Sequence, residues 1–395
     1  MITNFDSLFA GHVDVDNVGY AGTPVNDRSF SDEYLATAFD KSLAIAQLMD
    51  RTGYDTFWLA EHHFQLEGYE CIPNILMLSV HLSHLTERIN FGCGFNITPM
   101  WHPLRLAEDY ATADIFTKGR VRFGVGRGYH TREVETFGAP LLDQPANRDL
   151  FEEQVEIVFK ALKGRPFSHH GKHYDLPPQV PYRGYELTEL TLVPRPLYRP
   201  FECWQPIQSA TQRGLDFMVK HGIKGIIGGG VAEGGAMRKV VEAWKSAQAR
   251  AGHEKALGED LSIGFHFFLA DTAEKGIKEA SKYYEENIKM FGPLRLVRDL
   301  SDQQILDMAD PKLAPSAGLP TMEEAVKAGA VLCGPPERIV QQLRTLEEEY
   351  PGLDRVSVGQ PVGTPQKVIL EQLEWFSQEV MPEFTRRAPA SVQVD

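Results

Sequence analysis

The segment Tyr54–Phe64, with the sequence YDTFWLAEHHF, places three ionisable side chains directly after an apolar run. The run is typical of a buried strand, and Glu61, His62 and His63 follow it at once. Histidine has an ordinary pKa of about 6.5, so it can move protons at neutral pH. A single histidine at a strand end is more often a partner for the backbone, but three such groups together favour a catalytic role.

A metal site is the competing interpretation of these histidines. Neighbouring residues on a strand point to opposite faces, so His62 and His63 cannot easily bind one ion. A second group, formed by His169, His170 and His173, has the composition of a solvent-exposed hairpin. No partner motif completes a metal site in either place, and we therefore expect no metal.

A glycine-flanked arginine forms the second candidate site. In Gly119–His130, GRVRFGVGRGYH, a strand-like run ends in Gly126, Arg127 and Gly128. Glycine lets the backbone approach a ligand closely, and the forked guanidinium of arginine suits a phosphate. The sequence therefore predicts an anion-binding site at the end of this strand.

Two further strand ends have the composition of anion sites. Gln208–Thr211, QSAT, lies between the run WQPI and a helix that we expect to open near Gly214. Hydroxyls and free backbone N–H groups at a helix start bind phosphate, although an ordinary N-cap is an equally good interpretation of this segment alone. Gly228–Gly230 can form an anion-binding nest or a tight turn.

Short β-rich runs alternate with longer helical segments along the chain. The expected strands are Phe5–Gly11, Tyr54–Ala60, Ile89–Thr98, Arg120–Gly126, Trp204–Ala210, Ile223–Gly228, Ser262–Ala270 and Asp354–Gly359. Eight strands, each followed by a helix, predict an α/β protein with a closed (β/α)8 TIM barrel, and an open doubly wound sheet is the alternative. In a barrel, the candidate residues all lie at the C-terminal mouth, where catalytic groups of this fold sit.

Three stretches are longer than simple connectors, and we treat them as insertions in a single barrel domain covering residues 1–395. They comprise residues 12–31, 164–201 and 291–334. A small hairpin is expected around Ser168–Asp175. Long loops are often functional, and residues 291–334 are our first candidate for a mobile lid.

Composition restricts the partners and the compartment. The formal net charge of −14 argues against nucleic acid and anionic membranes, which need a basic surface. The four cysteines form no C-x-x-C pair, which is typical of reduced thiols in a cytoplasmic protein. The N-terminus does not have the pattern of a signal peptide, and no window of about 18 apolar residues predicts a membrane span.

The motifs together resemble a known family. YDTFWLAEHHF, then FGCGFNITPMWHPLRLAEDYATADIFTKGRVRFGVGRG, then WQPIQSAT, and the closing DRVSVGQPVGTPQKVILEQLEWFSQEVMP are similar to segments of the bacterial luciferase-like flavin-dependent monooxygenases. The resemblance covers nearly the whole chain and is weakest in residues 12–31 and 291–334. It implies the same barrel fold, reduced FMN as the cofactor and a homodimer.

The resemblance also assigns roles to residues. His62 matches the catalytic base, with Glu61 beside it, and the bond Gly94–Phe95 matches a non-proline cis peptide under the flavin ring. Arg127 and Ser209 match the residues that hold the flavin phosphate. The full set of implied cofactor-binding residues is Gly94, Phe95, Asn96, Arg127, Gly128, Tyr129, Gln208, Ser209, Ala210 and Thr211. Gly126 stands where the light-emitting catalytic subunits carry a cysteine, which argues against bioluminescence.

These expectations define one function and two alternatives. The chain is expected to oxygenate a small organic substrate with O2 and reduced FMN. Because no strand–GxGxxG–helix unit is present, the reduced flavin is expected from a separate reductase. The alternatives are a deazaflavin-dependent dehydrogenase on the same fold, since a fold does not settle the cofactor, and a non-catalytic flavin-binding protein.

Overall fold

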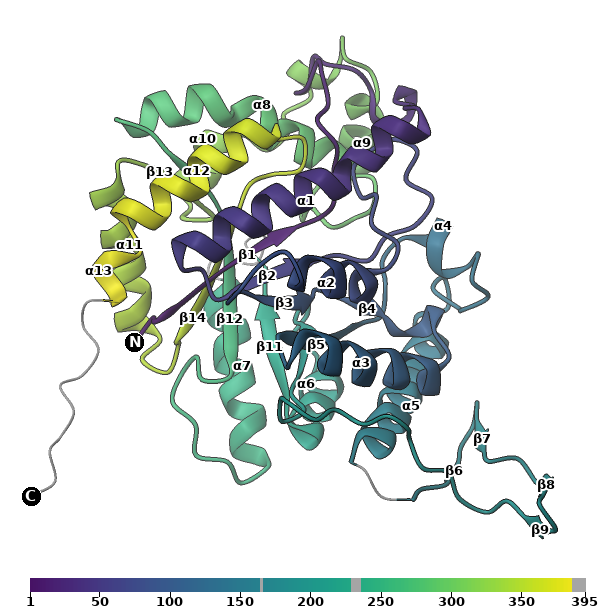
Figure 1. The fold of residues 1–395 in the computed structure, drawn as a ribbon. Coiled ribbons are helices and arrows are strands. Elements are labelled where there is room, and N and C mark those ends of the chain that lie inside the picture. Colours follow the sequence, from purple (N-terminus) through teal and green to yellow (C-terminus); the bar gives the residue numbers. More distant parts are fainter. Residues whose placement is uncertain (164–165, 229–235, 386–395) are drawn as a thin grey trace, which may run out of the picture.

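The computed structural model describes residues 1–163, 166–228 and 236–385. Eight parallel strands of this described part form a closed barrel (Figure 1). They are β1 (Asn4–Phe9), β2 (Thr56–Leu59), β3 (Asn90–Cys93), β5 (Val121–Gly126), β10 (Cys203–Pro206), β11 (Ile223–Ile227), β12 (Leu261–Leu269) and β14 (Arg355–Gly359). The barrel closes because β1 pairs with both β2 and β14 while β5 pairs with both β3 and β10. The predicted (β/α)8 fold is confirmed, and the open sheet is excluded.

Helices surround the barrel and cover its outer face (Figure 1). The main ones are α1 (Asp32–Thr52), α2 (Ile75–Ser83), α3 (Pro103–Thr117), α5 (Gln144–Leu162), α6 (Gln212–His221), α7 (Ala236–Arg250), α8 (Ala273–Phe291), α11 (Pro336–Glu349) and α12 (Gln366–Glu379). Short helices are α4 (Thr131–Val134), α9 (Asp302–Met308), α10 (Met322–Lys327) and α13 (Pro382–Thr385). The first helix shows why the sequence folds this way. The Ser31 side chain caps its start, and Gly53 ends it with a φ of 88°.

The core lies between the strands and the helices. Every residue of β2 and β5 is buried, as expected for parallel strands whose two faces are both covered. One cluster of buried apolar side chains joins all eight barrel strands to the surrounding helices. The barrel is therefore a rigid frame on which the strand ends are fixed in relation to one another.

Several predicted strand ends were one to four residues too long. The first strand ends at Phe9 rather than Gly11, and β10 ends at Pro206 rather than Ala210. The third predicted strand is divided into β3 and a two-residue strand, β4 (Asn96–Ile97), which pairs with β5. The break between them is the bond Gly94–Phe95, which is cis as predicted.

The insertions are partly as expected. Strands β6 (His169–His170) and β7 (Asp175–Leu176) form the predicted hairpin. A second hairpin, formed by β8 (Pro181–Tyr182) and β9 (Tyr185–Glu186), was not predicted. Both hairpins project from the body of the molecule (Figure 1). Residues 12–31 contain the single short 3-10 helix Val25–Asp27.

The description of residues 291–334 as an irregular stretch was wrong. It contains α9, α10, a 3-10 turn (Ala314–Ser316) and a strand, β13 (Val331–Gly334), which pairs in parallel with the second half of β12. Both helices begin with a capping box, Ser301 with Gln304 and Thr321 with Glu324. Their apolar side chains pack in a second buried cluster with α8. Local capping and this shared apolar core explain why the segment forms regular secondary structure, which the sequence analysis did not predict.

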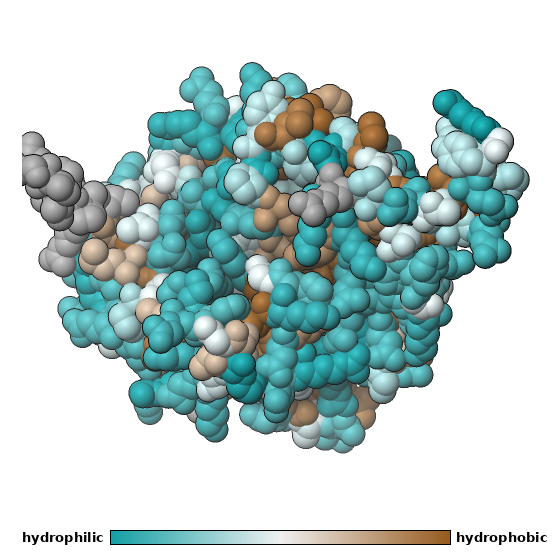
Figure 2. All heavy atoms as spheres, turned by 90° about the horizontal axis from the view of Figure 1, so that it is seen from below, coloured by the Kyte–Doolittle hydropathy of each residue, from teal (hydrophilic) through white to brown (hydrophobic). Residues whose placement is uncertain are grey.

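Among the described residues, no helix is long and apolar enough to cross a membrane. Hydrophilic side chains cover most of the face shown in Figure 2, and hydrophobic ones lie between them in small groups.

Candidate active site

The barrel brings the predicted residues to one end because all its strands run in the same direction. Glu61 and His62 follow β2, and Gly94–Phe95 follows β3. Arg127 follows β5, and the segment Gln208–Thr211 follows β10. The mouth then divides into a buried cluster around His62, a central cavity and a smaller pocket around Arg127.

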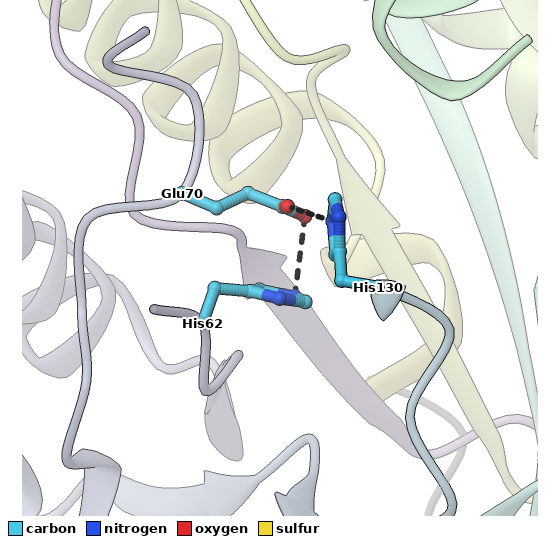
Figure 3. Close-up of side chains that lie close together, drawn as sticks. All are labelled: His62, Glu70 and His130. Carbon is cyan, nitrogen blue, oxygen red and sulfur yellow. Dashed lines mark hydrogen bonds and ion pairs between the residues drawn. The ribbon is translucent and has the colours of Figure 1, made fainter. Parts of the chain in front are cut away.

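The His62 ring lies between two buried carboxylates, those of Glu70 and Glu133. Figure 3 shows the Glu70 carboxylate with its two partners, His62 and His130. Its Nδ1 atom is 3.2 Å from Glu133 Oε2, and its Nε2 atom is 3.2 Å from Glu70 Oε1. The other oxygen of Glu70 is 2.9 Å from His130 Nε2. The Tyr129 hydroxyl donates to Glu70 at 2.7 Å and lies 3.0 Å from His62 Nε2. Residues from two loops, Glu70 from one and Tyr129, His130 and Glu133 from the other, thus surround this imidazole.

The cluster is arranged to hold a proton on His62. Burial alone lowers the pKa of His62, but the charges of Glu70 and Glu133 outweigh it, and the net pKa is raised. Burial and the Glu70 charge raise the pKa of Tyr129 well above its ordinary value, so the phenol stays neutral. The site therefore combines an imidazole whose pKa is raised with a neutral hydroxyl beside it.

Glu61 has different partners from those of His62. Its carboxylate accepts the Ile97 backbone N–H at 3.1 Å and the Trp101 indole N–H at 2.8 Å. His63 Nε2 also lies 3.3 Å from Glu61, and the His63 ring packs against Phe137. Glu61 thus fastens the end of β2 to the segment after β3, and the side chains of His62 and His63 diverge as predicted.

The cluster of His62, Glu70 and His130 also meets the geometric requirement for a metal site, with ligand atoms within 4.8 Å of one another. The sequence analysis did not foresee this grouping, because Glu70 and His130 belong to different loops. The His–Glu separations of 2.9 and 3.2 Å are hydrogen-bond distances, which account for all three side chains without an ion.

A cavity of about 250 Å³ opens at the centre of the barrel mouth. Gly94 and Phe95 line it on one side, as expected for a flavin ring site. His62 and Tyr129 are not among its lining residues. The Tyr129 ring packs against Phe291, with centroids 6.4 Å apart, and Phe291 does line the cavity. The His62 cluster therefore adjoins the cavity through these two rings.

A second pocket holds two arginines. Arg127 and Arg148 line it together with Gln208, Ser209 and Thr211, and Phe95 lines both this pocket and the central cavity. Burial and the neighbouring Arg148 charge lower the pKa of Arg127. Two guanidinium groups placed side by side repel each other, and an anion between them removes that repulsion.

The start of helix α6 completes this pocket. Thr211 is the N-cap residue of α6, yet its side chain makes no capping hydrogen bond. The absence of a side chain at Gly214 keeps the space open, since a Cβ there would lie 3.0 Å from Thr211 Oγ1 and 3.3 Å from Arg148 Nη1. Free hydroxyls, backbone N–H groups and two cations match a phosphate. The residues present therefore fit FMN, with its phosphate here and its ring beyond Phe95.

The structure brings together most, but not all, of the predicted cofactor residues. Those that line the pocket or the cavity are Gly94, Phe95, Arg127, Gly128, Gln208, Ser209 and Thr211. Asn96, Tyr129 and Ala210 line neither, and the Asn96 side chain donates to the Gly124 carbonyl. Of the predicted glycine nest, Gly228 lines the cavity, while Gly229 and Gly230 lie outside the described residues.

Sequence reasoning missed Glu70, Glu133 and Arg148. Glu70 lies in the loop after β2, and Glu133 lies in the short helix α4. Arg148 lies on α5, whose residues were interpreted only as a barrel-covering helix. No local pattern marks these three residues, and the sequence signal nearest to them was the quoted motif that ends in His130.

Comparison with known proteins identifies the family. The family model of luciferase-like monooxygenases matches residues 20–351. The oxygenase component of the flavin-dependent trigonelline monooxygenase of Acinetobacter baylyi is 24% identical, with 88% of this chain and 90% of that protein covered. Limonene 1,2-monooxygenase of Rhodococcus erythropolis is also 24% identical, with 88% and 82% covered. An uncharacterised Sinorhizobium fredii protein is 34% identical, but the match covers 39% of its length.

Solved structures with the same fold bind different cofactors. The oxygenating constituent of 3,6-diketocamphane monooxygenase of Pseudomonas putida, solved with FMN, has a TM-score of 0.67 at 20% identity, with 97% of this chain and 99% of that chain covered. An F420-dependent secondary alcohol dehydrogenase has a TM-score of 0.64 at 13% identity, with 97% and 99% covered. The barrel is shared by all of these proteins. Because the family model spans most of its length, the chain belongs to the luciferase-like monooxygenase family.

Proposed function

We propose that this protein is a monooxygenase that uses O2 and reduced FMN, supplied by a separate reductase, to oxygenate a small organic substrate. The observation that carries the proposal is the two-arginine pocket, which meets the uncharged central cavity at Phe95. A ligand that carries both a phosphate and an aromatic ring system needs a cationic pocket next to a largely apolar cavity. The name of the trigonelline relative, an oxygenase component, supports a reductase partner.

In this proposal, Arg127, Arg148, Ser209 and Thr211 hold the FMN phosphate, and the ring lies against Phe95 in the cavity. Reduced flavin, when bound, supplies the electrons that activate O2. The protein contributes orientation and exclusion of water, since the cavity is enclosed by apolar side chains such as Trp58.

His62 is the proposed proton-transfer residue. Its pKa is raised, and Nε2 is the atom proposed to give up or take back the proton. The neighbouring Tyr129 hydroxyl, 3.0 Å from Nε2, donates to Glu70 and so joins the imidazole and that carboxylate in one hydrogen-bonded chain. Glu70 and Glu133 hold the ring and balance its charge, and Glu61 is a positioning residue that acts through Ile97 and Trp101.

A deazaflavin-dependent dehydrogenase is the second candidate, supported by the fold likeness to the F420-dependent enzyme. A non-catalytic flavin-binding protein is the third, and the buried His62 cluster argues against it because a binding role does not require a charged imidazole. We also propose a homodimer, a single barrel domain and a cytoplasmic location. The free thiols of the four cysteines agree with that location.

The deciding experiment compares cofactors and then follows oxygen. Dissociation constants are measured for FMN, FAD and F420, and the protein is then mixed with pre-reduced FMN, isotopically labelled O2 and a substrate panel. The expected result is tightest binding of FMN and labelled oxygen in the product, unchanged by a metal chelator. Tightest binding of F420, or hydride transfer without oxygen incorporation, contradicts the proposal, and loss of activity with the chelator assigns a metal to the His62 cluster.

A further inference from the structure

The described residues that line the central cavity are all uncharged at neutral pH. Among the residues that line it in the described part of the chain there is no aspartate, glutamate, lysine or arginine. Its walls are largely apolar, with Leu8, Trp58, Phe265 and Val362 among them. A second, outer pocket makes the contrast clear, since Asp27, Glu67, Arg132 and Lys289 all line it.

His12 is one of two histidines in the cavity wall, and it is held neutral. Its Nε2 atom lies 3.0 Å from the carbonyl oxygen of Thr364. A carbonyl can only accept, so the proton is on Nε2, and Nδ1 presents a lone pair. Burial, with a smaller contribution from the nearby Lys41 charge, lowers the pKa of His12 well below its ordinary value. Lys41 itself forms an ion pair with Asp14 at 2.8 Å.

His266 is the other histidine in the wall. Burial lowers the pKa of His266 to about 4, so this imidazole is also neutral at physiological pH. The cavity therefore offers neither a counter-ion for a charged ligand nor a histidine that becomes one at neutral pH.

Three buried polar atoms of the lining residues have no protein partner. They are His12 Nδ1, Ser262 Oγ and Gln360 Oε1. Gln360 donates its amide N–H to the Phe267 carbonyl at 2.9 Å, which leaves Oε1 as an acceptor. All three atoms are almost completely shielded from the cavity, so they offer no hydrogen-bond partner to a charged ligand there.

We propose that the substrate is an uncharged, largely apolar organic molecule, and that the cavity excludes carboxylates and ammonium ions. This inference rests on the proposed function, because it assumes that substrate and flavin share the cavity. An ion brought into this cavity would lose its water without gaining a partner of opposite charge. A neutral molecule loses less hydration free energy on entering such a cavity.

The test uses matched alcohol and carboxylate pairs of graded size: hexanol with hexanoate, octanol with octanoate, and perillyl alcohol with perillate. Binding to the complex with oxidised FMN is measured by calorimetry and by the change in the flavin spectrum, so no turnover is needed. At least one alcohol is expected to bind, with its carboxylate roughly 100-fold weaker. Equal or tighter binding of the carboxylates, or no binding of any alcohol, overturns the inference.

A substitution at Gly264 locates this binding. Gly264 lines the cavity on β12, which is opposite β3 and Phe95 in the strand order. A Cβ at this position would lie 3.6 Å or more from its neighbours, so a side chain is tolerated without backbone strain. Gly264→Leu is expected to weaken alcohol binding about 10-fold or more by filling the space, and Gly264→Ala to have a smaller effect in the same direction.

Unchanged alcohol binding in Gly264→Leu overturns the inference, because the probes then bind elsewhere. If Gly264→Leu does not fold, the same comparison is made with Gly264→Ala. The affinity of the wild-type protein for FMN distinguishes failure of the proposed function from failure of the proposed substrate class alone. If FMN does not bind, the proposed function fails, whereas if FMN binds and the pairs are not discriminated, only the substrate class is wrong.

Discussion

His62 Nδ1 lies 3.2 Å from Oε2 of Glu133, a residue that follows it by 71 positions in the chain. The same carboxylate accepts the His63 backbone N–H at 3.0 Å and the Gln65 side-chain amide at 3.1 Å. Glu133 therefore fixes the loop after β2 and supplies charge to the imidazole at the same time. The short helix α4, which follows β5, thus controls the orientation and the protonation of a residue just after β2.

Replacement of His62 by alanine tests the proton-transfer role. Product formation from pre-reduced FMN should fall by about 10²–10⁴-fold, the usual contribution of a general acid or base, while FMN affinity stays within a few-fold. His63→Ala is the matched control, since its ring packs on Phe137 outside the cluster and should affect stability by about 1 kcal/mol. Wild-type turnover in His62→Ala would show that the base is another residue, and loss of FMN would make His62 a binding residue.

The titration of His62 should depend on Glu133. Because Glu133 is one of the charges that raise the pKa of His62, Glu133→Gln should lower that pKa. The part of the pH–activity profile that depends on His62 should then move to lower pH. NMR titration of the His62 ring should likewise give a lower pKa. Glu67→Gln is the control, because Glu67 pairs with Arg132 at the surface. An unshifted His62 in Glu133→Gln, with the ring still in place, would contradict the electrostatic account.

The raised pKa of His62 also has a consequence for folding. The folded state binds the His62 proton more tightly than the unfolded chain does, so the resulting stabilisation is fully present below the ordinary pKa of 6.5. It is lost as pH rises through the raised value. Urea unfolding of the wild type should therefore show a fall in stability over this range, and His62→Gln should remove that part of the pH dependence.

Much of the site follows from one rule, which is that parallel barrel strands end on the same side. Because of this rule, the sequence alone predicts that His62, Arg127 and Ser209 lie at one mouth of the barrel. The cis bond at Gly94–Phe95 came from family resemblance alone, because no pattern of residue types marks it. Arg148 could not be found this way, since it lies near the start of the covering helix α5 and not at a strand end.

The missed elements have physical reasons as well. Strand β13 has four residues, VLCG, and so short an apolar run does not distinguish a strand from a buried turn. Glu70 and Glu133 meet His62 through loops whose paths depend on tertiary packing. The capping boxes at Ser301 and Thr321 were visible in the sequence as S-x-x-Q and T-x-x-E, and they would have predicted α9 and α10.

A buried ion network should control the stability of the barrel mouth. Glu286 on α8 accepts from Arg28 at 2.9 Å and from Lys289 at 2.8 Å, and all three side chains are almost fully buried. Glu286→Ala leaves two buried cations without their carboxylate and should lower the free energy of unfolding by about 3–5 kcal/mol. Glu279→Ala, exposed on the same helix, should change it by less than about 0.5 kcal/mol. Equal urea midpoints for the two variants would mean that the network contributes no net stability.

The phosphate pocket predicts a graded loss of FMN affinity. Arg127→Ala should weaken FMN binding by about 1.5–3 kcal/mol, the range for a hydrogen bond to a charged group. Arg148→Ala should give a comparable loss, because both guanidinium groups line the same pocket. Riboflavin, which lacks the phosphate, supplies the control: its affinity should be nearly the same in the wild type and in both variants. If either arginine variant binds FMN as tightly as the wild type, that arginine does not contact the phosphate. If riboflavin is weakened equally, the substitutions act on the ring site or the fold rather than on the phosphate.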